Sequence, residues 1–361
     1  MIVYYSIFAF LAFGGLYGAS LREMDSALHS HAKRFLFALA AFILIFIAGF
    51  RAATVDRDYL GYEAFFKCVS DRISQSDCQI EPVFVAVSKL SNVLGLGIEG
   101  VIFLYAVLSV TVFTTIIYRS ETPYLSLLTY FCASFLLHEM TQIRVGLGIA
   151  VALWGLDYLY RRERLKYLLT CAIAATIHIS CLAFLVLAIF RTDRHQLIHG
   201  VLLIFAAIAL SFTNLLSPVY KLIFQYFYEV NSSFIAYAPS GGDLSNRFGF
   251  IKSGFLALYL VCALNAKRIA LYVPKVYIYL NSMLAAICSL YVFYSLPAVS
   301  LRFWELFGSV VLFLLPASIY ARSARSWRMA AIAGVTAVDG LYLFYFVDYE
   351  RIVEGYKSIL F

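Results

Sequence analysis

Four arginines border long apolar stretches of the chain and could hold an anion there. Arg51 ends one such stretch, and Arg144, Arg247 and Arg302 each open another. A guanidinium is planar and offers paired donors that suit a phosphate. At a helix start, the backbone N–H groups and the helix dipole also favour an anion. The four arginines predict a site for an anionic headgroup. Arginines that only snorkel to the membrane interface would show the same pattern and are the alternative.

Acids and histidines near these arginines are candidates for proton transfer. His178 stands alone in an apolar run. An ionisable group within a membrane is costly, and histidine takes and gives protons near neutral pH. A structural histidine bonded to a backbone carbonyl is the alternative. His138 and Gln142 are spaced i, i+4 and share a face if that segment is helical. The remaining candidates are Asp58, Glu81 and Glu139.

The sequence lacks the motifs of several enzyme classes. It contains no GxxxxGK[ST] loop and no GxGxxG after a predicted strand, so we expect no nucleotide site. It also lacks HExxH, metal-type Cys/His spacing and GxSxG, so we expect no metal and no cofactor. Cys68 and Cys78 share one polar loop, where they either form a disulfide or remain free thiols.

The composition indicates the class of protein that must position these residues. Of the 361 residues, 63% are hydrophobic and 14% are charged. Soluble proteins have about 45–50% apolar and about 25% charged residues. Long unbroken apolar runs argue against a β-barrel. We therefore expect an all-α, polytopic integral membrane helix bundle. The net charge is +7, but no block of Lys and Arg residues is interleaved with aromatic residues. We therefore expect the positive charge to lie in the cytoplasmic loops of a membrane protein, and we expect no nucleic-acid partner.

Short polar and basic segments separate the apolar runs into about ten or eleven spans. We expect spans near 1–21, 35–50, 98–118, 124–137, 145–160, 197–213, 248–265, 276–296, 302–320 and 328–347. Together they form one transmembrane domain over 1–361. An extracytoplasmic loop covers 51–97, with a re-entrant or interfacial helix near 81–97, and a second long extracytoplasmic loop covers 214–247.

The segment 167–190 is either one span or a hairpin of two short helices that meet at His178. The hairpin places the basic loops at 161–166 and 191–196 on the same side, as the positive-inside rule favours. It also keeps the imidazole away from the bilayer centre. With the hairpin, the short cytoplasmic loops hold 16 of the 28 Lys and Arg residues.

The order of the motifs resembles the EpsG family, which is similar to Wzy polymerases, over about residues 35–320. The first block comprises GFR (49–51), the run Asp58-Tyr59-x-x-Tyr62 and EPVF (81–84). In the second block, TQIRVGLGIAVALWGLDYLY is followed by TIHIS, and the family's positions are filled by Gln142, Arg144, His178 and Ser180. The third block is LRFWELFGSVVLFLLP.

The resemblance implies a glycosyltransferase that joins undecaprenyl-pyrophosphate-linked oligosaccharide units at the periplasmic or outer face of the bacterial inner membrane. The pyrophosphate would be bound by Arg51, Arg144, Arg247 and Arg302. His178 would be the general base, with Glu139 and Asp58 as further catalytic candidates. The acceptor or sugar would contact Glu81, Gln142, His138 and Tyr62. Further partners would be the lipid bilayer and the pathway's chain-length regulator and flippase.

Other functions fit parts of the pattern. A flippase or transporter needs ionisable groups along an aqueous path. Asp157 and Asp339 are isolated in the sequence and do not suggest a relay. An O-antigen ligase would use the same extracytoplasmic Arg and His residues, so the sequence does not separate it from a polymerase. A membrane O-acyltransferase would need its histidine within reach of an acyl donor, whereas a structural or assembly protein would need no convergent arginines.

Overall fold

The protein is helical across the residues that the computed structural model describes, which are 1–20, 27–70, 80–213, 215–216, 218–220 and 249–360. Within these ranges no strand forms, and the two isolated backbone bridges join Arg51 to Ser358 and Asp56 to Val353. The all-α class predicted from the apolar runs is confirmed. Arg247, Cys78 and most of the loop 214–247 lie outside the described residues.

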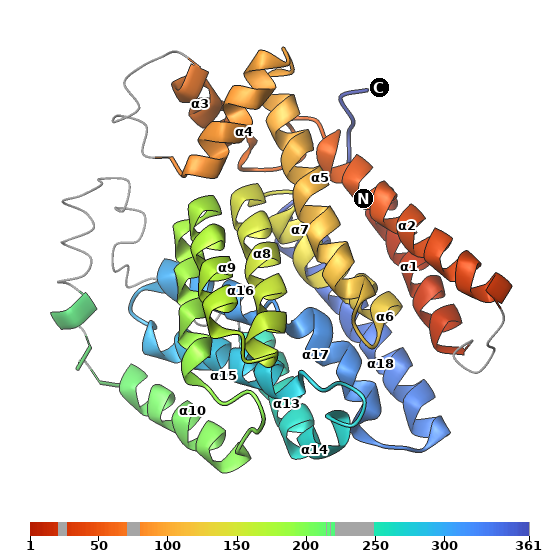
Figure 1. Ribbon diagram of the computed structural model, residues 1–361, viewed down its shortest axis with the longest axis vertical. Helices are drawn as coiled ribbons and strands as arrows, with labels where there is room; N and C mark the ends of the chain where they lie inside the picture. The colour runs from red at the N-terminus through yellow and green to blue at the C-terminus, as the bar shows by residue number, and fades with distance from the viewer. Residues whose placement is uncertain (21–26, 71–79, 214, 217, 221–248, 361) are drawn as a thin grey trace. The chain divides into compact units, whose positions relative to one another are not determined.

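The chain forms two compact units. Unit 1 comprises Met1–Leu182 and Ser323–Phe361, and unit 2 comprises Ala183–Arg322. The helices of unit 1 (Figure 1) are α1 (Ile2–Ser20), α2 (Ala27–Gly49), α3 (Tyr59–Ser70), α4 (Pro82–Val93), α5 (Gly97–Tyr118), α6 (Pro123–Tyr130), the π-helix η2 (Phe131–Phe135), α7 (Leu136–His138), α8 (Ile143–Tyr160), α9 (Arg164–Ile177), α18 (Arg325–Phe344) and the π-helix η6 (Tyr345–Tyr349). A single transmembrane domain over 1–361 stays a prediction.

The described part of unit 2 holds further helices. A 3₁₀ helix, η3 (Ile179–Ile189), runs across the boundary between the units, and it is followed by α10 (Leu197–Ser211), α13 (Gly249–Leu264), α14 (Ala266–Ile269), α15 (Val276–Val292), α16 (Pro297–Gly308), α17 (Val311–Ala317) and the 3₁₀ helix η5 (Ser318–Ala321).

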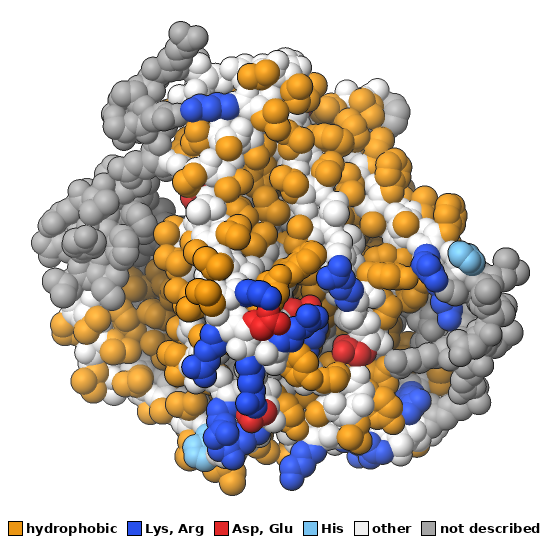
Figure 2. Space-filling model, in the orientation of Figure 1, with side chains coloured by type: hydrophobic (Ala, Val, Ile, Leu, Met, Phe, Trp, Pro, Cys, Tyr) orange, Lys and Arg blue, Asp and Glu red, His pale blue; other side chains and the backbone are white. Residues whose placement is uncertain are grey.

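Four described helices are long and apolar enough to cross a membrane. They are His31–Gly49, Gly97–Tyr118, Ile143–Tyr160 and Ser326–Tyr349, and a bent pair would make a fifth. Further apolar helices of 10–17 residues accompany them. Hydrophobic side chains also cover much of the visible surface (Figure 2). The rings of Phe13, Phe42 and Phe205 are among the exposed hydrophobic side chains. Such a surface suits lipid rather than water, so the chain is a multi-pass membrane protein. The number of ten or eleven spans stays a prediction.

Two expected elements differ in the structure. The polar stretch 51–80 contains the helix α3, which the sequence pattern did not suggest because it lacks a long apolar run. The expected span 302–320 is instead a pair of helices bent by 52°. The break follows Gly308, where an added Cβ would lie 2.8 Å from the ring of Phe255. The close approach of α13 at this glycine explains why a larger residue would not fit there.

The predicted break at His178 is confirmed. Helix α9 ends at Ile177, and His178 has an extended backbone (φ −153°, ψ 121°) before η3 begins. Helix α8 packs closely against this region because it carries glycines at the contact. A Cβ on Gly155 would meet Thr170 at 3.1 Å, and one on Gly148 would meet the Sγ of Cys181 at 2.6 Å. Small residues commonly permit such close helix packing in membranes.

The C-terminal segment of unit 1 pairs with the loop that follows α2. The backbone N–H of Ala52 donates to the carbonyl of Lys357 at 2.9 Å, and that of Glu354 donates to Val55 at 2.8 Å. In the same loop, Oδ1 of Asp56 accepts from the backbone N–H of Asp58 at 2.9 Å, directly before α3 begins. The tail therefore holds the loop from which α3 starts.

Candidate functional site

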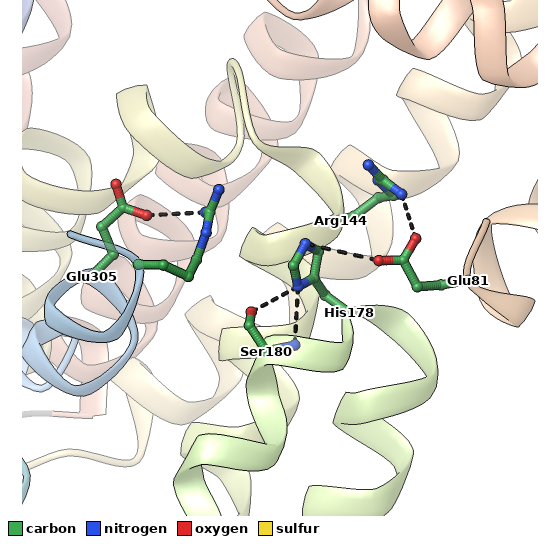
Figure 3. A network of polar contacts seen from close by, with 6 residues as sticks. Glu81, Arg144, His178, Ser180 and Glu305 are labelled. Carbon is green, nitrogen blue, oxygen red and sulfur yellow. Dashed lines mark hydrogen bonds and ion pairs between the residues drawn. The ribbon is translucent and has the colours of Figure 1, made fainter. Parts of the chain in front are cut away.

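Four polar residues of unit 1 come together at helix ends (Figure 3), and we name them the Glu81 cluster: Glu81, Arg144, His178 and Ser180. Glu81 forms an ion pair with Nη1 of Arg144 through Oε2. Its other oxygen, Oε1, lies 3.8 Å from Nε2 of His178. The opposite nitrogen of His178, Nδ1, lies 2.7 Å from Oγ of Ser180. One carboxylate therefore stands between a guanidinium and an imidazole.

Each member of the Glu81 cluster stands at a helix end for a local reason. Glu81 precedes Pro82, which occupies the first turn of α4, and a residue before proline is held in the extended conformation found here. The Glu81 side chain makes no capping bond, so its carboxylate is turned to Arg144. Arg144 lies in the first turn of α8, and His178 follows the last residue of α9. Glu81 and Arg144 thus stand at two helix N-termini, where the helix dipole favours negative charge.

A hydrophobic core fixes these helix ends in place. Ile143 and Ile177, the neighbours of Arg144 and His178, are 2% and 4% exposed in one cluster with Phe84 of α4. Because the residues beside the functional groups are anchored, the polar side chains have little freedom to move apart. Folding of this core therefore assembles the Glu81 cluster.

Aromatic rings enclose the guanidinium of Arg144. Its Cζ lies 4.7 Å from the ring centroid of Phe65 and 5.7 Å from those of Tyr62 and Phe84. Such cation–π contacts strengthen when the group is shielded from water, and only 17% of the Arg144 side chain is exposed. Its Nε is buried with no hydrogen-bond partner among the described residues. Arg144 thus offers a further donor in a rigid setting.

Arg51 lies in a different environment from Arg144. Its Nε donates to Oδ2 of Asp56 at 2.7 Å, its Nη1 donates to the carbonyl of Ala48, and both charged side chains are 0% exposed. A guanidinium enclosed in this way is shielded from a substrate. In this structure Arg51 ties Asp56 of the loop after α2 to the end of that helix, and its role as a pyrophosphate ligand stays a prediction.

Replacing Arg51 by alanine is expected to lower the free energy of unfolding by about 3–5 kcal/mol, because Asp56 would remain buried without its partner. Thermal unfolding of the detergent-purified protein measures the loss. The double variant Arg51→Ala/Asp56→Asn should recover part of it, since no buried charge is left. The exposed Arg161, at the end of α8, provides the control variant Arg161→Ala. An Arg51→Ala protein as stable as this control would contradict the structural role.

The turn between α7 and α8 holds three of the predicted residues. Helix α7 ends at His138, so the helical spacing expected for His138 and Gln142 does not apply. Both His138 and Glu139 are buried, and Gln142 precedes the first residue of α8. Burial raises the pKa of the Glu139 carboxyl to about 7, and its neighbours Ser109 and Tyr130 offset this shift only in part. The neutral, protonated form of Glu139 is therefore favoured relative to an exposed carboxyl group.

The remaining predicted residues are spread over the chain. Asp58 is exposed directly before α3, and Tyr62 is buried on α3 against Arg144. Arg302 lies on α16 in unit 2, where Nη1 donates to Glu305 at 3.0 Å. Each described arginine of the predicted site therefore forms an ion pair with a different carboxylate.

Sequence reasoning did not pair these side chains with several of their neighbours. Asp56 and Glu305 stand within five residues of their arginines, a spacing that could have suggested both pairs. Phe65 carried no signal, because only the packing of α3 brings it to Arg144. The sulfur of Cys68 is disulfide-bonded. Cys78 lies outside the described residues. Among the described residues no group of His, Cys, Asp and Glu side chains is arranged to hold a metal ion.

A multi-pass helical membrane protein with an Arg–Glu–His cluster at its helix ends is the class that this structure defines. The chain belongs to the EpsG family, whose model matches residues 34–355. The resemblance seen in the motifs is therefore confirmed, and it covers nearly the whole chain. EpsG is a family of Wzy-like polysaccharide polymerases, so the chain is assigned to polysaccharide polymerisation at the level of the family. No curated protein and no solved structure matches the chain.

Proposed function

We propose that the protein polymerises oligosaccharide units linked to undecaprenyl pyrophosphate, at the periplasmic or outer face of the bacterial inner membrane. The glycan of one unit leaves its lipid pyrophosphate and joins a hydroxyl of the next. The observation that carries the proposal is the Glu81 cluster, because it holds a phosphate-binding group and a proton-accepting group around one carboxylate. This pairing is what transfer from a pyrophosphate to a hydroxyl requires.

In this proposal Arg144 binds the pyrophosphate of the donor. A pyrophosphate carries more negative charge than one carboxylate, so it competes with Glu81 for the guanidinium. The buried Nε of Arg144 supplies a donor that Glu81 leaves unused. The aromatic rings of Phe65, Tyr62 and Phe84 keep the guanidinium oriented during this exchange. Arg302 and Arg247 are proposed as further pyrophosphate ligands, whereas Arg51 supports the loop.

His178 is proposed as the general base that takes the proton of the acceptor hydroxyl. Glu81 stabilises the resulting imidazolium, since Oε1 lies 3.8 Å from Nε2. Glu139 is the second candidate, because its pKa of about 7 is suited to proton transfer, although it is 1% exposed. Asp58, His138, Gln142 and Tyr62 are proposed to support the acceptor side of the site.

The test is an assay with the purified protein in proteoliposomes and undecaprenyl-pyrophosphate-linked repeat units. We expect a ladder of longer lipid-linked glycans and one undecaprenyl pyrophosphate released for each bond formed. A ligase would transfer glycan only to an added separate acceptor, and a flippase would move the donor between leaflets without new bonds. A folded protein that lengthens no glycan would refute the proposed polymerase.

A further inference from the structure

The hydrogen bonds of His178 determine which of its nitrogens carries the lone pair. The backbone N–H of Ser180 points to Nδ1 at 3.3 Å, and a backbone N–H can only donate. Nδ1 is therefore an acceptor. In a neutral imidazole the other nitrogen then carries the proton, so Nε2–H faces the carboxylate of Glu81.

The lone pair of His178 is covered by a hydroxyl. Oγ of Ser180 lies 2.7 Å from Nδ1, and since Nδ1 is the acceptor, the hydroxyl of Ser180 donates to it. The proton donors of these side chains therefore point in one direction (Figure 3). The hydroxyl of Ser180 donates to Nδ1 of His178, and Nε2–H of His178 faces the carboxylate of Glu81. Oγ of Ser180 occupies the lone-pair side of Nδ1, and the Ser180 side chain is only partly buried, so a substrate hydroxyl could reach this nitrogen through it.

We propose that Ser180 is a catalytic proton relay between the acceptor hydroxyl and His178. This inference rests on the proposed polymerase function. The acceptor oxygen bonds to the anomeric carbon of the donor while the bond from that carbon to the pyrophosphate oxygen breaks, and the electron pair leaves with the pyrophosphate. The acceptor's proton passes to Oγ of Ser180 as the proton of Ser180 passes to Nδ1 of His178. The imidazolium is paired with Glu81 and later returns its proton to water.

Ser180→Ala is expected to lower the turnover of glycan transfer by about 10- to 100-fold, because water replaces the relay poorly. The KM for the lipid-linked donor should stay unchanged, because Arg144 is untouched. Ser180→Thr keeps the hydroxyl and should restore most of the turnover. The matched control is Thr176→Ala, since Thr176 is an exposed hydroxyl residue of α9 whose side chain donates to the carbonyl of Ile173 in its own helix. Turnover as low in this control as in Ser180→Ala would overturn the relay.

A proton inventory in mixtures of H₂O and D₂O separates a relay from a structural role. Two protons move together in the relay, so the rate of the wild-type protein should fall along a curved line as the D₂O fraction rises. For Ser180→Ala the line should become straight. A straight line for the wild-type protein, normal turnover of Ser180→Ala, or a glycan covalently trapped on Ser180 would each overturn the relay.

A measurement without turnover tests the same geometry. In the full-length protein labelled with ¹⁵N-histidine, the NMR shifts of His178 should show Nδ1 unprotonated and Nε2 protonated, with the signal assigned from His178→Ala. A proton on Nδ1 of the neutral ring would overturn the relay even if the protein polymerises glycans. Wild-type protein that forms no glycosidic bond, with the expected tautomer present, would instead overturn the proposed function and the relay with it.

Discussion

Replacing Arg144 by alanine is expected to reduce the rate of glycan lengthening by a factor on the order of 10²–10³, the usual loss when one donor to a developing negative charge is removed. In the proposed reaction the leaving pyrophosphate gains negative charge as its bond to the sugar breaks. Arg144 is the proposed donor to this charge, and the aromatic rings hold it in one orientation. The rate and the KM for the lipid-linked donor, measured in proteoliposomes, report the effect.

Two further variants make the Arg144 experiment specific. Arg144→Lys keeps the charge but loses the planar fork, so it should restore only part of the rate. Arg161→Ala removes an exposed arginine from the other end of α8 and should leave the rate unchanged. Because Arg144→Ala leaves Glu81 without its guanidinium, folding is checked by thermal unfolding. Unchanged polymer length and yield in a folded Arg144→Ala protein would show that Arg144 does not bind the pyrophosphate.

Replacing His178 by alanine is expected to reduce turnover by a factor on the order of 10²–10⁴, which is the usual contribution of a positioned general base. The donor should still bind, because Arg144 and its aromatic surroundings remain. The acceptor hydroxyl, however, would lose the base to which its proton is finally transferred, so the loss should appear in kcat rather than in KM. Steady-state rates at several donor concentrations separate the two quantities.

The control for His178 is His199→Ala, since His199 is exposed on α10. It should leave both kcat and KM unchanged. His178 also ends α9, so a structural role is the competing explanation, and the two roles differ in their signatures. A structural role predicts a lower melting temperature for His178→Ala with little loss of turnover in the protein that remains folded. Normal turnover of His178→Ala would show that His178 serves only the turn between α9 and η3. Glu139 would then be the remaining candidate for the base.

The regular parts of the fold were predictable because they depend on local sequence. Runs of about 20 apolar residues mark helices that can span a bilayer, and α5 (Gly97–Tyr118) and α8 (Ile143–Tyr160) begin and end close to the expected positions. The break at His178 followed from the charges of the loops on either side. The helix α3 was missed because its apolar residues face a small core and do not form a long run.

The candidate site was only partly predictable. The sequence by itself determined the class of membrane protein, the family motifs and the types of residue able to bind a pyrophosphate and move a proton. Only the tertiary structure decided which of them lie together. Arg51 and Arg144 look alike in sequence, yet one is enclosed with Asp56 and the other shares Glu81 with His178. The reason is physical: hydropathy reports local preference, whereas the pairing of charges depends on which helix ends the core brings together.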